Sequence, residues 1–388
     1  MAKVRFGDVV QEVKHNIDRT NNPYEFYVAG DHMDTADLTI HRHGCFATDD
    51  VGPAFVREFK KGQVLYGSRR TYLKKIAMAD FDGVTANTTF VLETKNSDVF
   101  LQTLLPFVML TDSFTEWSVK RSKGSTNPYV LFSDLADFEF ELPDIEEQQR
   151  ISDVLWACFR LQEKYKGLIQ KCDVLVQSRF VEMFGDPVKN PLGFQTMPLA
   201  QVTTQIISGQ CLNGDAGILQ PGQKAVLKVS AVTYGYFKDD EYKILHNPEQ
   251  IAKGVYPQKG DLLFSRANTR EYVGATALIE RDYPDLMLPD KLWKLVFTDE
   301  INPVFAKQFL SHPEVRRVMS EMATGTSGSM YNISMEKLKK LVMVVPNIEL
   351  QRIFAQFVKQ TDKSKFAIQQ TLDSLMKSQK TIMEETFG

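Results

Sequence analysis

Three residues at every second position of the sequence could bind a metal ion. His41, His43 and Cys45 stand two residues apart, so on a β-strand their side chains would share one face. Imidazole and thiolate groups are the ligands that zinc prefers. Asp49 and Asp50 follow, but no fourth ligand of matching spacing is evident. We therefore favour polar strand residues at a surface, keep a zinc site as the alternative, and expect no metal.

Two other patterns could carry catalysis. Asp82 with Glu93-x-Lys95 loosely resembles the D…E-x-K pattern of nucleases, a pattern that often arises by chance. Asn127–Tyr129 (NPY) resembles the Asn-Pro-Pro-Tyr motif of amino-methyltransferases but lacks one proline and has no cofactor loop upstream. The chain has no Walker A sequence and no G-x-G-x-x-G fingerprint. We therefore expect a strand end and a loop at these positions, no catalytic residues and no cofactor.

Basic residues interleaved with polar and aromatic ones give a stronger signal. Lys and Arg neutralise phosphates, Arg and Asn can read base edges, and Ser and backbone N–H groups fix register on phosphates. For any single residue a solvated charge is the alternative, but the clusters recur in both halves of the chain. The candidates in the first half are Arg69, Arg70, Lys74, Lys75, Lys120, Arg121, Lys123, Ser125, Asn127 and Tyr129. Those in the second half are Arg266, Asn268, Arg270, Lys291, Arg316, Arg317, Ser327, Ser329, Tyr331 and Asn332.

A repeated segment follows each of these halves. Pro143–Gly185 and Pro346–Gly388 match without a gap at a constant offset of 203 residues, which is a strong internal-repeat signal. Apolar residues at steps of three, four and seven predict one long helix of coiled-coil type in each copy. We expect these helices over 144–185 and 347–388, each about 60 Å long, and we expect them to pack antiparallel around a pseudo-twofold axis. Two unrelated amphipathic helices are the alternative.

The apolar seam of these helices has two possible partners. Tyr165, Phe366, Met376 and Met383 lie at or near its edges. The helix pair could bury the whole seam, which we favour, or part of it could face another protein.

The two remaining stretches predict globular domains. Residues 1–143 form the first and 186–346 the second, which begins with an irregular Pro-rich linker over 186–197. Short apolar runs between Gly, Asp and Asn residues predict strands, and a Gly/Ser-rich loop precedes each long helix. The predicted fold class is α+β, with two β-rich domains separated by the two long helices. In the first domain the predicted elements are strands at Glu25–Ala29, Gly62–Tyr66 and Thr88–Leu92, a helix over 100–119 and the loop Lys120–Tyr129.

Composition sets the broad class of the protein. Of 388 residues, 43% are hydrophobic and 11% aromatic, which is typical of a globular protein. No apolar run reaches the length of a membrane span, and no signal-peptide pattern is present. The four cysteines form no C-x-x-C pair, which fits a reduced, cytoplasmic compartment. A net charge of −3 argues against indiscriminate nucleic-acid binding and leaves room for a local basic cleft.

The order of these parts closely resembles the specificity subunits of type I restriction-modification systems. The resemblance covers essentially the whole chain: a globular domain, the KGSTNPY loop, FEFELPDIEEQQRI and a long helix, then the same plan again. Its most specific parts are the two helix entries and the stretches SRFVEMFGDP and DKSKFAIQQ. The globular domains match in plan only.

The resemblance implies a function. Each globular domain would be a target recognition domain that reads one half of a bipartite double-stranded DNA site, and the helices would be the spacer between them. The helices would also bind two modification (methyltransferase) subunits, to which restriction (translocase-nuclease) subunits add. Adenine-N6 methylation would belong to the modification subunits, so this chain would have no catalysis of its own. A self-contained DNA-modifying or DNA-cleaving enzyme and a coiled-coil scaffold that reads no DNA are the alternatives.

Overall fold

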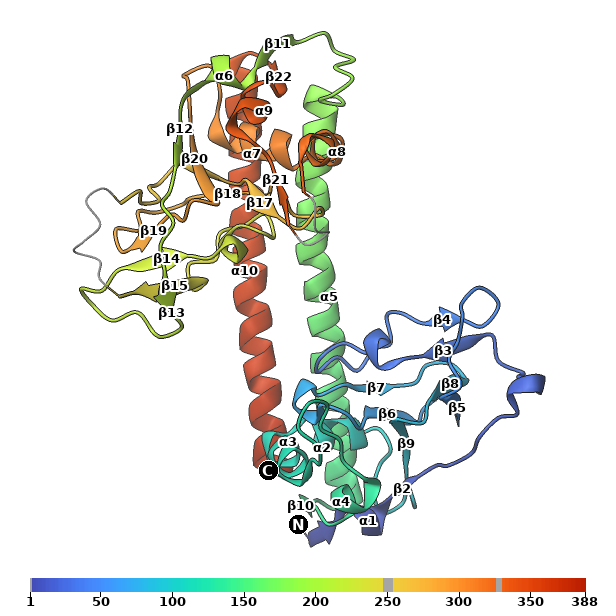
Figure 1. Cartoon of the computed structure of the whole chain (residues 1–388). Helices are drawn as coiled ribbons and strands as arrows, with labels where there is room; N and C mark the ends of the chain where they lie inside the picture. The colour runs from blue at the N-terminus through green and yellow to red at the C-terminus, as the bar shows by residue number, and fades with distance from the viewer. Residues whose placement is uncertain (1, 247–253, 326–329) are drawn as a thin grey trace. The chain divides into compact units, whose positions relative to one another are not determined.

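We describe a computed structural model of the chain, over residues 2–246, 254–325 and 330–388 (Figure 1). The class is mixed helix and sheet, as predicted. The chain divides into two compact units. Unit 1 comprises Met1–Gly167 with Ile368–Gly388, and unit 2 comprises Leu168–Ala367. Each unit therefore contains part of both long helices.

Both long helices are present as predicted. They are α5, Ile145–Phe184, and α10, Ile348–Phe387 (Figure 1). Asp144 accepts a hydrogen bond from the Glu147 N–H at the start of α5 (2.9 Å), which satisfies one of the free donors of its first turn. Gly185 follows α5 with φ +70°, a left-handed conformation that ends a helix. None of the helices in the described ranges has the length and apolarity needed to cross a membrane.

Unit 1 holds two four-stranded sheets. In the first, every neighbouring pair is antiparallel, and its order is β2 (Val10–Glu12), β9 (Thr89–Thr94), β6 (Val64–Gly67) and β7 (Ile76–Met78). In the second, β3 and β8 are parallel, and its order is β4 (Gly44–Cys45), β3 (Phe26–Val28), β8 (Gly83–Ala86) and β5 (Phe55–Phe59). A separate pair joins β1 (Ala2–Arg5) to β10 (Glu139–Leu142), which leads into α5.

Short helices and 3₁₀ turns connect the strands of unit 1. They are α1 (Phe6–Val9), α2 (Leu105–Leu110), α3 (Asp112–Arg121) and α4 (Phe132–Ala136), with 3₁₀ turns η1 (Arg19–Asn21), η2 (Gly30–His32) and η3 (Thr71–Leu73). The ring of Phe107 on α2 lies 5.1 Å from that of Trp156 on α5. Leu155 of α5 and Phe387 of α10 are buried in the same core. The first turns of α5 and the last turns of α10 therefore belong to one hydrophobic core.

Unit 2 repeats much of this plan. Its first sheet is again antiparallel, in the order β12 (Thr203–Ser208), β20 (Leu292–Phe297), β16 (Leu262–Ser265) and β18 (Thr276–Leu278). Its second sheet again contains one parallel pair, β14 with β19, in the order β13 (Gly214–Asp215), β15 (Tyr242–Leu245), β14 (Ala225–Leu227) and β19 (Leu286–Met287). Two separate strand pairs also belong to the described part of unit 2. They are β11 (Gln195–Pro198) with β22 (Val342–Val345), and β17 (Ala267–Asn268) with β21 (Tyr331–Asn332).

The helices of unit 2 surround a core rich in phenylalanine. They are α6 (Leu199–Val202), α7 (Pro303–Ser311), α8 (Pro313–Met322) and α9 (Met335–Lys339), with the 3₁₀ turn η4 (Val229–Ala231). Phe184 of α5, Phe305 of α7 and Phe354 of α10 are fully buried in one cluster, and their rings lie 4.8–5.5 Å apart where they touch Phe184. Parts of both long helices are thus built into this core as well.

The structure corrects three local expectations. The helix predicted over 100–119 is two helices, α2 and α3, because Thr111 is extended and caps α3 through the Phe114 N–H (3.2 Å). The end of the linker predicted over 186–197 belongs to strand β11. Of the residues at the edges of the seam, Met383 is buried, whereas Phe366 and Met376 are exposed.

Candidate nucleic-acid interface

The Gly/Ser loop of unit 1 is held by main-chain hydrogen bonds. Lys123 and Tyr129 exchange two of them, with N···O distances of 2.8 and 2.9 Å. The next residue, Val130, donates from its N–H to the carbonyl of Ser68, at the end of β6 (3.0 Å). These bonds close residues 124–128 into a loop and dock it beside the segment that follows β6.

That segment has an unusual backbone. Arg70 and Lys74 flank η3 with φ values of +50° and +45°, a conformation uncommon for residues other than glycine. The Arg70 N–H donates to the carbonyl of Pro128 in the Gly/Ser loop (2.7 Å). Tyr72, at the middle of η3, is 53% exposed. The two segments together present an edge of exposed polar, basic and aromatic side chains.

The predicted cations of unit 1 fall into two groups. Arg69, Arg70 and Lys120 are exposed, and within the described residues their side chains have no hydrogen-bond or ion-pair partner. In contrast, the Lys74 ammonium donates to the Leu110 carbonyl (3.1 Å) and to Asp112 (2.9 Å). Only the first group is free to meet phosphates or bases without first breaking a contact.

The other predicted residues of unit 1 are partly engaged. Lys75 donates to the Gly30 carbonyl (2.5 Å), Lys123 pairs with Asp134 (3.0 Å), and the Arg121 guanidinium lies 4.3 Å from the Trp117 ring centroid. Burial alone would raise the pKa of Asp134, but the Leu131 N–H and the Lys123 ammonium together hold that pKa below its usual value. Ser125, Asn127 and Tyr129 are exposed on the Gly/Ser loop.

Unit 2 builds the same arrangement at its own Gly/Ser loop. Thr324 and Asn332 exchange two main-chain hydrogen bonds of 2.9 Å. The next residue, Ile333, donates to the carbonyl of Arg266, at the end of β16 (2.9 Å). The pair β17–β21 extends this contact between Asn268 and Tyr331. The predicted residues Ser327 and Ser329 lie outside the described residues.

Several predicted side chains of unit 2 are bonded within the protein. Arg266 pairs with Asp290 (3.2 Å) and donates to its carbonyl (2.9 Å). The Asn268 amide donates to the Thr233 hydroxyl (3.2 Å) and accepts from the Thr269 N–H (2.8 Å). Arg317 pairs with two carboxylates of its own helix, at 3.1 and 2.8 Å. Each of these groups therefore has a partner within the protein that a contact with DNA would have to share or replace.

Arg316 is withdrawn from the surface. One guanidinium nitrogen donates to the Glu271 carbonyl (2.8 Å), and another has no hydrogen-bond partner within the described residues. Burial lowers its pKa to about 10, so it remains a cation at neutral pH. The more accessible candidates of unit 2 are Lys291, which is half-buried, and exposed Arg270, whose guanidinium lies 5.9 Å from the Tyr331 ring centroid.

The structure does not bring the catalytic patterns together. Asp82 accepts from the Lys61 N–H (2.8 Å), Glu93 accepts from the Gln11 amide (2.8 Å), and Lys95 donates to the Gly7 carbonyl (2.5 Å). Each group thus has a different partner. Asn127–Tyr129 forms part of the docked Gly/Ser loop.

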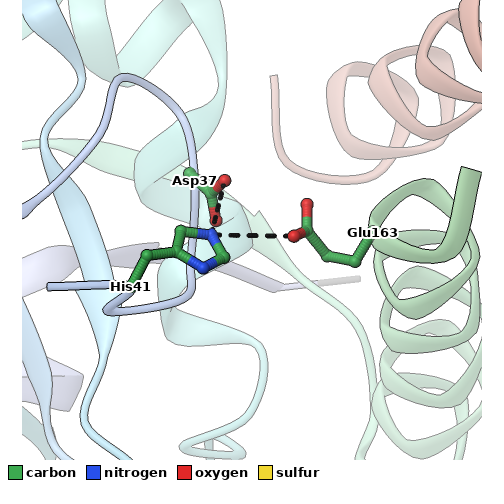
Figure 2. A group of neighbouring side chains, drawn as sticks. All are labelled: Asp37, His41 and Glu163. Atoms are coloured by element: carbon green, nitrogen blue, oxygen red, sulfur yellow. Dashed lines mark hydrogen bonds and ion pairs between the residues drawn. The ribbon is translucent and has the colours of Figure 1, made fainter. Parts of the chain in front are cut away.

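The potential zinc ligands also separate. The His43 ring lies 4.2 Å from the Phe26 ring centroid, while His41 joins Asp37 and Glu163 instead, at 3.2 and 3.6 Å (Figure 2). Their ligand atoms lie within 4.8 Å of one another, and they are the one group of three or more such ligands within the described residues. The Lys166 ammonium already contacts both carboxylates, at 3.3 and 2.7 Å. This cluster is therefore an ion-pair network that links the loop of Asp37 to α5.

One exposed group near this edge is absent from the predicted set. Tyr234 and Tyr236 are 57% and 56% exposed, and the Thr233 hydroxyl beside them receives the hydrogen bond from Asn268. The run YGYFK, in which tyrosines alternate and a lysine follows, is the sequence signal for them.

Comparisons with known proteins find similarity to DNA specificity subunits. The family model of the type I restriction modification DNA specificity domain matches residues 55–171. The specificity subunit of the type I restriction enzyme EcoKI from Escherichia coli K12 is 24% identical over 268 residues, which are 64% of this chain and 57% of that protein. The EcoEI specificity subunit from Escherichia coli is 26% identical over 199 residues, 50% of this chain and 33% of that protein. The chain thus spans about half the length, or less, of these curated relatives.

A solved structure shares the whole fold. The type I restriction-modification S subunit from M. genitalium has a TM-score of 0.56 at 14% identity, with 100% of this chain and 96% of that chain covered. A chain from a study of the assembly of a type I R-M system gives the same TM-score at 20% identity, with 99% and 97% covered. The domain match and the curated relatives show that the chain is similar to type I restriction-modification specificity subunits, and the solved structures show that it shares their fold.

Proposed function

We propose that the chain is the sequence-specific DNA-binding subunit of a type I restriction-modification complex. It recognises a bipartite double-stranded site and directs adenine-N6 methylation, and restriction, by partner subunits. It has no catalytic activity of its own. It acts in the cytoplasm, where its DNA substrate lies.

The observation that carries the proposal is the recurrence of one loop arrangement in both units. In each, a Gly/Ser-rich loop is closed by two main-chain hydrogen bonds and docked through the next N–H onto the end of a central strand, at Ser68 or at Arg266. Gly-rich backbone and polar side chains suit contacts to phosphates, and the basic and amide side chains around them suit base edges. A chain with two such edges can read two half-sites.

The side chains on the two edges differ, which suits two different half-sites. The edge of unit 1 carries the free guanidinium groups of Arg69 and Arg70, which match the two acceptors of guanine in the major groove. The edge of unit 2 carries Arg270 beside Tyr331. We assign residues 1–143 and 186–346 to the two target recognition domains.

The long helices have the length for a spacer. We assign 144–185 and 347–388 to this role, as an antiparallel pair around a pseudo-twofold axis. About 60 Å of helix is enough to bridge half-sites one DNA turn apart, about 34 Å. Exposed apolar side chains along α5, among them Val154, Leu161 and Leu175, suit contact with the two modification subunits, to which the restriction subunits add.

Methylome sequencing tests the proposal. Cells that carry this chain with its modification subunit should show a split adenine-methylated motif, and cells that lack only this chain should not. The motif would also name both half-sites. Unchanged methylation without the chain would contradict the proposal and favour a scaffold. Methylation or cleavage by the purified chain alone would favour a self-contained enzyme.

A further inference from the structure

Unit 2 presents a loop with two exposed tyrosines between η4 and β15. The Lys238 N–H donates to the carbonyl of Ala231 (2.9 Å), and the Lys228 N–H donates to that of Glu241 (2.9 Å). Gly235 takes a left-handed φ of +81° at the tip, which glycine adopts without strain. Two main-chain hydrogen bonds therefore close the loop, one near its tip and one at its base.

The side chains of this loop divide between the core and solvent. Phe237 packs against the Tyr283 ring, 4.9 Å away, at the edge of a buried cluster. Tyr234 and Tyr236 point the other way and are more than half exposed. The Tyr234 ring meets that of Tyr272 edge-on at 5.8 Å. Grouped exposed aromatic residues mark interaction sites more often than scattered ones do.

A cation completes the group. The Lys238 ammonium lies 4.8 Å from the Tyr234 ring centroid and 5.6 Å from that of Tyr236, within the range of cation–π attraction. Of the three carboxylates that follow it, two are bonded within the protein: Asp239 to Arg281 (2.6 Å) and Glu241 to Lys228 (3.3 Å). Much of the local negative charge is thus balanced.

The loop adjoins the edge already described. Thr233, next to Tyr234, accepts the Asn268 amide (3.2 Å), and Asn268 pairs with Tyr331 of the Gly/Ser loop. The Asn268 amide is bonded through both its nitrogen and its oxygen, which fixes its position between this loop and the edge. Within the described residues, the Tyr234 and Tyr236 hydroxyls and the Lys238 ammonium have no hydrogen-bond or ion-pair partner and can meet DNA.

We propose that Tyr234, Tyr236 and Lys238 form a further DNA-contact site of unit 2, which binds phosphates and sugars beside its half-site. This inference rests on the proposed function. Tyrosine hydroxyls and lysine are common donors to phosphates, and such contacts fix the position of the protein on the duplex. Tyrosines also offer a large contact area at a small entropic cost.

The test uses the chain in complex with its modification subunits, and a duplex that contains the methylated bipartite motif. Tyr234→Ala with Tyr236→Ala should weaken binding roughly tenfold or more. Hydroxyl-radical protection should be lost at the half-site of unit 2 and kept at the other. Lys238→Ala should reduce the slope of log K against log salt by about one. Val342→Ala serves as the control, because Val342 on β22 is similarly exposed (56%). This variant should change neither the affinity, nor the footprint, nor the salt slope.

The outcomes separate the two proposals. If the double variant binds within about twofold of wild type with an unchanged footprint, the site proposed here is wrong and the proposed function stands. If the wild-type complex gives no footprint on the motif, the proposed function fails, and this inference fails with it. Thermal unfolding checks that the double variant is folded, as expected for two exposed side chains.

Discussion

Gln148 and Gln351, which stand 203 residues apart, make the same three hydrogen bonds in their respective units. Each is fully buried in the first turn of a long helix. Each amide nitrogen donates to the proline carbonyl before the helix and to a second carbonyl, and each amide oxygen accepts a main-chain N–H, with distances of 2.7–3.0 Å. The partners are Pro143, Val99 and Leu101 for Gln148, and Pro346, Glu300 and Asn302 for Gln351.

Replacing either glutamine by methionine should destabilise its unit. The side chain keeps its approximate volume, but a main-chain N–H and two carbonyls lose their partner in a buried place, so we expect a loss of about 2 to 3 kcal/mol. Urea unfolding measures it. Gln149→Met is the matched control, because Gln149 is exposed and its amide donates to Asp153 on the same helix (3.1 Å). Equal stability of Gln148→Met and Gln149→Met would contradict the prediction.

Arg69→Ala combined with Arg70→Ala should weaken DNA binding without loss of stability. Both guanidinium groups are exposed and have no hydrogen-bond or ion-pair partner in the described part of the chain, so we expect the change to remove contacts to DNA only. We expect the affinity to fall roughly tenfold or more and the salt slope to decrease. Titration of the motif duplex at several salt concentrations measures both. Arg317→Ala should reduce the affinity less, because the Arg317 guanidinium is paired with carboxylates on α8. A larger loss of affinity in Arg317→Ala than in the double variant would argue against DNA binding by the edge of unit 1.

Lys74→Met should act on stability instead. The Lys74 ammonium is bonded to the Leu110 carbonyl and to Asp112, and Asp112 also pairs with Lys380 of α10 (2.6 Å). Loss of these bonds should cost about 1 to 2 kcal/mol. If unfolding is unchanged and DNA binding falls, Lys74 leaves its internal partners to meet DNA.

Exchange of residues 1–143 for the same segment of another specificity subunit should change one half of the methylated motif. The segment excludes the second Gly/Ser loop and everything docked on it, so the other half-site should be read as before. Methylome sequencing of cells with the chimaera gives the answer directly. A chimaera that changes both halves, or neither, would show that the two readers are not independent.

Unit 1 should lose stability in acid through Glu58 on β5. The Lys60 ammonium (2.8 Å) and the Tyr24 hydroxyl bond to this carboxylate and lower its pKa to about 2. Because the folded pKa is lowered, the stabilisation is fully present above the ordinary value of about 4.5 and is lost as the pH falls toward 2. It amounts to at most about 3 kcal/mol.

Glu58→Gln should therefore flatten the dependence of unfolding free energy on pH between about 4.5 and 2. Urea unfolding at several pH values measures this slope. Glu146→Gln, at an exposed position in the first turn of α5, is the control. An unchanged slope in Glu58→Gln would mean that other carboxylates govern the acid response.

The long helices could be predicted because their signal is local and long. A regular apolar period over 40 residues, bounded by proline and glycine, leaves few alternatives. The break between α2 and α3 could not, because the apolar pattern runs across it and only the extended backbone of Thr111 ends one helix and caps the next. The break between α7 and α8 at His312 has the same origin, although Pro313 gives a signal there.

The two Gly/Ser loops could be located in the sequence, but the internal partners of the basic residues around them could not. Gly, Ser and Asn between basic residues marked both loops. Whether a given cation is free depends on partners distant in sequence: Asp112 for Lys74 and Asp290 for Arg266. Such pairings are set by the tertiary fold, so charge pattern alone overestimated the number of available groups.

The docking of the Gly/Ser loops has an evolutionary consequence. Val130 and Ile333 fasten them through N–H groups to the carbonyls of Ser68 and Arg266, and any residue except proline supplies such groups. Residues 124–128 and 325–331 differ in length by two, yet the anchors are the same. Selection can therefore lengthen or rewrite these segments while the scaffold keeps its stability, which makes recognition an easily inherited and easily altered trait.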